Sequence, residues 1–131
     1  MAEAVRDAFA TAQVRLLEEL VAQPSCTREP EDVEAAFAIL DREAEALGLV
    51  RSLHPDPSGR FATHRVYATA AAGDGPAIAL VGHLDTVFPR AMGFAGFTRE
   101  GDVARGPGVL DMKSGLTSIL FALRALRRAS P

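Results

Sequence analysis

Residues 77–89 read AIALVGHLDTVFP, and this stretch decides how the rest of the chain is interpreted. Its first five residues are continuously apolar, which is typical of a strand covered on both faces inside an α/β sheet. His83 follows shortly after that run. Because ligands bind at the carboxyl ends of strands in open α/β sheets, the sequence places a candidate site at this histidine.

The flanking segments predict helices and further strands. Apolar residues recur at three- and four-residue steps between positions 5 and 20, which predicts a helix that ends before Pro24. A second helix is expected to begin at Pro30 and to be capped by Gly48. The remaining elements are expected as strands at 50–54, 64–70 and 77–81, a connection at 73–76, a hairpin over 98–105 and a last helix over 114–128. The order ααββββα predicts an α/β fold in which a mixed sheet is flanked by helices.

Composition excludes several classes of protein. The 131 residues suit one domain or a piece of one, and 14 basic against 17 acidic residues leave a net charge of −3. This balance offers no broad cationic surface for nucleic acid, and no apolar run approaches the roughly 18 residues of a membrane span. The single cysteine, Cys26, rules out an internal disulfide and suits a reducing compartment. We therefore expect a cytoplasmic protein without a nucleic-acid or membrane partner.

His83 and Asp85 are the first residues that suggest chemistry. In an extended backbone, residues two apart point to the same side, so these two side chains would be neighbours. A carboxylate beside an imidazole fixes its tautomer and raises its basicity, which is the usual support for a metal-bound histidine. The alternative is an ordinary His-x-Asp in a surface turn.

The second candidate segment is RGPGVLDMKSG at 105–115, a tight loop that leads into the last helix. Asp111 lies near the start of that helix, where an aspartate is otherwise most often a cap. A phosphate-loop interpretation fails, because Met112 and Pro107 occupy the two positions where that motif needs glycine. Together with His83, Asp111 makes a mixed nitrogen and oxygen ligand set that suits zinc, with cobalt or manganese as alternatives.

The two segments, GHLDTVFP at 82–89 and RGPGVLDMKSG at 105–115, resemble in order the N-terminal signatures of one zinc metallopeptidase family. That family includes aminoacylases, glutamate carboxypeptidases, acetylornithine deacetylase and succinyl-diaminopimelate desuccinylase. LLEELVAQPSCTREPEDVEAA at 16–36 is similar to its N-terminal helix and loop. The resemblance covers essentially the whole chain. Ser114 stands where the family most often has glycine, and a serine still fits a helix start.

The resemblance implies a role for each motif residue. His83 would be a terminal ligand of one zinc, and Asp111 would bridge two zincs. Asp85 would have a catalytic role without binding metal, by orienting His83. The Asp111–Met112 peptide bond would be cis. The implied reaction is hydrolysis of an amide or peptide bond in a small N-acyl amino acid or short peptide, by water activated at two zinc ions (or cobalt), in a full-length homodimer.

The resemblance also implies parts that these 131 residues do not contain: a Glu-Glu pair with the general base, a later carboxylate ligand, a final histidine and a dimerisation domain. Residues 1–131 are therefore expected to be the N-terminal portion of a catalytic domain, inactive and weak in zinc binding when alone. One alternative is a truncated, non-catalytic homologue; another is an anion-binding α/β domain that uses the last helix's N-terminus. His54 and His64 are expected to be solvated, and Cys26 to be a small loop residue.

Overall fold

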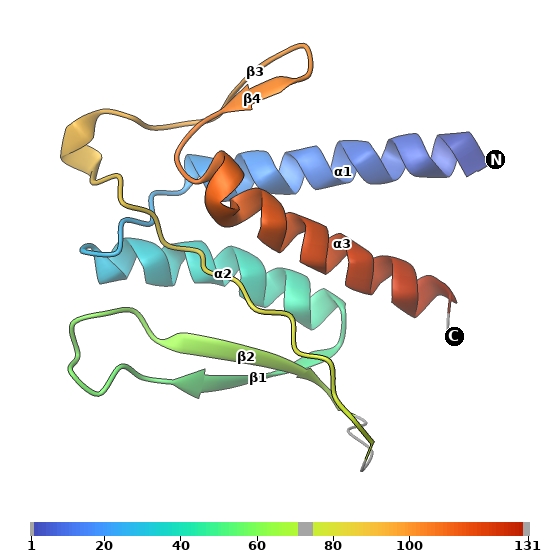
Figure 1. The fold of residues 1–131 in the computed structure, drawn as a ribbon, viewed down its shortest axis with the longest axis horizontal. Coiled ribbons are helices and arrows are strands. Elements are labelled where there is room, and N and C mark those ends of the chain that lie inside the picture. The colour runs from blue at the N-terminus through green and yellow to red at the C-terminus, as the bar shows by residue number, and fades with distance from the viewer. Residues whose placement is uncertain (1, 71–74, 130–131) are drawn as a thin grey trace.

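The computed structural model describes residues 2–70 and 75–129 of the chain. Within these residues the fold consists of three helices and two separate hairpins (Figure 1). The helices are α1 (Ala2–Ala22), α2 (Pro30–Ala46) and α3 (Ser114–Ala129). The antiparallel hairpins are β1 (Leu49–His54) with β2 (His64–Thr69), and β3 (Thr98–Glu100) with β4 (Val103–Arg105). A short 3-10 turn, Arg90–Met92, and an irregular turn, Val109–Lys113, complete the structure.

The predicted helices and hairpin strands are confirmed, with bounds that differ by at most three residues. Pro30 begins α2 with Glu31 and Asp32 in its first turn, where the helix dipole favours negative charge. Gly48 follows α2 with a positive φ of 64°, as expected of a glycine beyond a helix end. Part of the connection expected at 73–76 lies outside the described residues. In the described part of the chain, no helix is long and apolar enough to cross a membrane.

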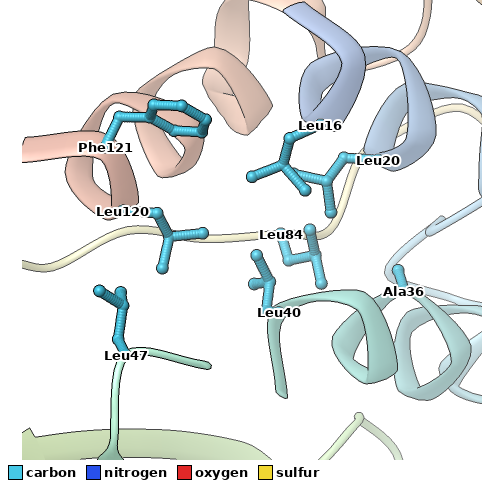
Figure 2. Packing of buried hydrophobic residues seen from close by; sticks show 8 residues of the cluster. All are labelled: Leu16, Leu20, Ala36, Leu40, Leu47, Leu84, Leu120 and Phe121. Carbon is cyan, nitrogen blue, oxygen red and sulfur yellow. The ribbon is translucent and has the colours of Figure 1, made fainter. Parts of the chain in front are cut away.

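The core lies where the three helices meet. Its buried side chains come from α1, α2 and its C-terminal end, α3, and one residue of the connecting chain (Figure 2). They are Leu16, Leu20, Ala36, Leu40, Leu47, Leu84, Leu120 and Phe121. Leu84 is the connecting residue and is only 3% exposed. The chain beside the candidate histidine is thus anchored by burial of a leucine.

The hairpin β1–β2 is held against α2 by charged and polar side chains. Asp41 of α2 accepts hydrogen bonds from the Tyr67 hydroxyl at 2.6 Å and from Arg51 at 2.5 Å. Arg65 donates to Glu34 at 2.7 Å and lies over the ring of Phe37. Burial and the hydrogen bond to Asp41 raise the pKa of Tyr67 above its ordinary value. These contacts fix the hairpin beside the helices without joining it to a larger sheet.

The expectation of a mixed sheet is wrong for the described residues, and so is the strand at 77–81. Residues 77–81 run as a coil toward the site, and Ile78 is 91% exposed (Figure 1). A strand persists only where a neighbour pairs with its backbone N–H and C=O groups. Within residues 2–70 and 75–129 the only sheets are the two hairpins, so these residues have no strand to pair with. The observed fold is a mixture of helices and small antiparallel sheets.

Candidate metal centre

The segment that carries His83 is held in place by the core and by the loop after α1. Burial of Leu84 turns the two flanking side chains, His83 and Asp85, away from the core, as alternation along an extended chain requires. Thr86 N donates to Ser25 O at 2.7 Å, and Thr27 N donates to Thr86 O at 2.9 Å. These bonds join the two segments as a short parallel bridge. His83 therefore has a defined position although residues 77–81 form no strand.

The segment that carries Asp111 is fixed by a glycine and a buried lysine. Gly108 has a φ of 73°, and a Cβ there would lie 2.9 Å from the Thr86 side chain, so the two segments approach closely. Lys113 is fully buried and donates from Nζ to Leu20 O at 2.7 Å and to Gln23 O at 3.0 Å. Its ammonium thereby satisfies carbonyls at the C-terminal end of α1. Burial lowers the pKa of Lys113 to about 8.

The peptide bond between Asp111 and Met112 is cis, as the family resemblance implied. Asp111 has extended backbone angles, with φ −121° and ψ 99°, three residues before α3 begins. Its side chain is 86% exposed and extends toward the segment that carries His83.

His83 and Asp111 meet at the geometry expected of two ligands. Nε2 of His83 lies 3.1 Å from Oδ1 of Asp111. Two donors at about 2.0–2.1 Å from one tetrahedral zinc are separated by about 3.3 Å, so the observed distance fits a shared ion. On the other side of the ring, Nδ1 lies 3.0 Å from the backbone oxygen of Asp85 and 3.3 Å from its carboxylate Oδ1. The approach of the three residues was predicted from the sequence and is present in the structure.

The electrostatics of the pair follow from these contacts. Partial burial of the imidazole disfavours its charged form. The hydrogen bonds to the Asp111 carboxylate and the Asp85 carbonyl, with the charges of both acids, outweigh burial and raise the pKa of His83 above its ordinary value. A divalent cation would relieve the same concentration of negative charge, since it replaces the proton on Nε2.

Residues 79–131 match the family model described as Peptidase family M20/M25/M40. The chain is also 31% identical over 117 residues to carboxypeptidase G2 from Pseudomonas sp. (strain RS-16). Both matches place the motifs of this chain within the peptidase family M20/M25/M40. The match covers 88% of this chain but only 28% of the carboxypeptidase, so the chain spans less than a third of that relative's length.

Enzymes of the M20 family generally use zinc, and the donor atoms of His83 and Asp111 are of types that bind zinc. An imidazole nitrogen and a carboxylate oxygen are common zinc ligands, but a catalytic zinc takes three ligands from protein. Across residues 2–70 and 75–129, no group of three or more histidine, cysteine or acidic side chains is arranged to hold a metal. The described residues therefore supply a two-donor part of such a site.

A pocket of about 470 Å³ opens beside the pair. It is bordered by His83, Asp85 and Asp111, by apolar side chains and by one cation, Arg105. The apolar members are Val87, Phe88, Phe94, Val109 and Leu110. Phe88 and Phe94 pack edge to face with their ring centroids 5.0 Å apart. A small organic molecule placed here would meet both the polar pair and an apolar wall.

The other sequence candidates lie elsewhere, and two contributing residues were not predicted. His54 and His64 are exposed, in agreement with their predicted solvation, and are paired across the β1–β2 hairpin. Cys26 is buried in the bridge to Thr86. Sequence reasoning missed Thr27, whose hydroxyl donates to Asp85 Oδ2 at 2.5 Å, and the anchoring contacts of Lys113. Neither role has a local sequence signal, because the residues that Thr27 and Lys113 contact lie far away in the sequence.

Proposed function

We propose that this chain contributes His83 and Asp111 to the metal centre of a zinc-dependent hydrolase that cleaves amide or peptide bonds. The observation that supports this most is the 3.1 Å approach of Nε2 and Oδ1, with Asp85 on the opposite ring nitrogen. The family match and the name of the carboxypeptidase relative support the same reaction class. They favour it over simple anion binding at α3.

Each of the three residues has a distinct task in this proposal. His83 would hold the metal through Nε2, and Asp111 would hold it through its carboxylate. Asp85 accepts a hydrogen bond from the Nδ1–H group, which would leave Nε2 as the ring nitrogen for the metal. Zinc bound here supplies a Lewis acid that polarises a carbonyl and activates water. The apolar wall of the pocket would contact the apolar part of a substrate held at the pair.

The substrate and assembly belong to the same proposal. We propose a small N-acyl amino acid or short peptide as the substrate, because the pocket combines an apolar wall with the Arg105 guanidinium. We place residues 1–131 in the N-terminal portion of a catalytic domain of a cytoplasmic homodimer. The three motif residues and the pocket are then one side of a larger active site.

Zinc titration of the full chain by calorimetry tests the proposal. His83→Ala and Asp111→Asn should each weaken zinc binding by more than the roughly 10- to 100-fold typical of an outer-shell partner. His54→Ala is the matched control, because it removes an exposed imidazole from the hairpin. Zinc affinities of the first two variants equal to that of the parent would contradict the proposal. So would an equal loss in the control.

A further inference from the structure

We propose that Thr27 is a positioning residue for this centre: its hydroxyl orients the Asp85 carboxylate, which in turn orients the imidazole of His83. The inference rests on the proposed function, since it assigns Thr27 a role in metal binding. Oγ1 of Thr27 lies 2.5 Å from Oδ2 of Asp85, and the other oxygen, Oδ1, lies 3.3 Å from Nδ1 of His83. The carboxylate is therefore shared between the hydroxyl and the ring.

The direction of the hydroxyl proton follows from its two possible acceptors. Oγ1 of Thr27 also lies 3.1 Å from the backbone oxygen of Thr86. A hydroxyl has one proton to donate, and bonds to an ionised carboxylate are shorter and stronger than bonds to a neutral carbonyl. The 2.5 Å contact with Asp85 thus receives the proton. Donation by Thr27 holds the Asp85 carboxylate in the orientation that faces the histidine.

Thr27 can position Asp85 because its own backbone is fixed to the same segment. Its N–H donates to Thr86 O at 2.9 Å, and Thr86 N donates to Ser25 O at 2.7 Å. The Ser25 hydroxyl adds a bond to Leu84 O at 3.0 Å. Apart from the contacts of the Thr27 hydroxyl, these three bonds connect residues 25–27 to residues 84–86. The hydroxyl is held at a constant distance from the carboxylate by this short parallel bridge.

The consequence for His83 is the orientation of its ring. Nδ1 faces two acceptors, the backbone oxygen and the carboxylate of Asp85, so it donates on this side. Nε2 then faces the Asp111 carboxylate, where a metal ion would replace its proton. Without the Thr27 hydroxyl, the partly exposed Asp85 carboxylate is free to rotate toward solvent. Only the backbone carbonyl would then hold the ring, and the metal pair would be less well organised.

The test compares three variants of the full chain by zinc competition with a chromophoric chelator. Thr27→Val removes the hydroxyl with little change in shape and should weaken zinc binding about tenfold, the lower end of outer-shell effects. Thr27→Ser keeps the hydroxyl and should restore affinity close to that of the parent. Thr98→Val makes the same chemical change on exposed β3 and should leave affinity unchanged. If valine prevents folding, Thr27→Ala makes the same comparison.

A second measurement needs no metal. In nitrogen-15-edited NMR of the metal-free chain, the Nδ1–H proton of His83 should exchange slowly with water in the parent and in Thr27→Ser, and faster in Thr27→Val. Parent-like affinity together with an unchanged Nδ1–H exchange rate in Thr27→Val would overturn the inference. If His83→Ala and Asp111→Asn bind zinc like the parent, the proposed function fails instead. The exchange rate of the Nδ1–H proton then still decides whether Thr27 orients Asp85 and His83.

Discussion

Replacing Leu84 with alanine tests whether burial of one side chain sets the position of the metal pair. Leu84 is 3% exposed and packs with leucines of all three helices (Figure 2). Leucine-to-alanine changes in a core lose the transfer free energy of the removed groups and leave a cavity, at a cost of about 2–5 kcal/mol. Because helices on several sides limit collapse around Leu84, we expect a loss of about 3 kcal/mol. His83 and Asp85 flank this residue, so zinc affinity should fall as well.

Urea unfolding measures the first effect and zinc titration the second. Leu110→Ala is a matched control: Leu110 also adjoins a proposed ligand, Asp111, but it is 86% exposed. Its substitution should change the free energy of unfolding by no more than about 0.5 kcal/mol. Equal losses in the two variants, or a loss below about 1 kcal/mol for Leu84→Ala, would refute the reasoning that core burial anchors this segment.

Three further predictions concern the loop, the lysine and the histidine. In urea unfolding, Gly108→Ala should lower the free energy of unfolding by about 1–3 kcal/mol more than Gly59→Ala. Both glycines have a positive φ, but only a Cβ at Gly108 would meet atoms of neighbouring side chains. Equal losses in the two variants would contradict the close approach of the two segments at Gly108. Lys113, the chain's single lysine, should react with an amine-directed reagent only slowly until urea unfolds the chain, as mass spectrometry can show; rapid labelling of the folded chain would contradict its burial. The pKa of His83 is raised, so its contribution to stability in the metal-free chain should be present below about pH 6.5 and lost as pH rises through the folded value. Asp111→Asn should lower that pKa in an NMR titration, and an unchanged value would show that Asp111 does not act on the ring.

The helices could be predicted from sequence because their signals are local. Apolar spacing in α1 and α3, and proline and acidic residues at the start of α2, are each read within one turn or two. The segment 77–81 shows the limit of this reasoning. Its apolar run indicates a strand buried between two layers of structure. Whether a strand forms, however, depends on backbone hydrogen bonds to a second strand, which the run itself does not identify.

In the candidate site, too, local relations could be predicted from the sequence and tertiary contacts could not. His83 and Asp85 could be grouped from the sequence because alternation places residues two apart on one side. Thr27 could not, since its partner Asp85 lies 58 positions away and a threonine in a polar loop has no distinguishing pattern. From the sequence, Lys113 had a possible role only as the lysine of a phosphate loop, and that motif was rejected. In the structure its Nζ donates to carbonyl oxygens that lie 90 and 93 positions earlier in the chain. Both residues act through tertiary contacts, which only the folded chain provides.

The most direct test of the account is nitrogen-15 NMR of the full chain during zinc titration, observed at the two ring nitrogens of His83. The account predicts that zinc shifts Nε2 while Nδ1 keeps its proton, and that Asp111→Asn weakens the response. An Nε2 signal that stays unshifted at saturating zinc, or zinc bound at Nδ1 instead, would contradict the proposed His83–Asp111 centre.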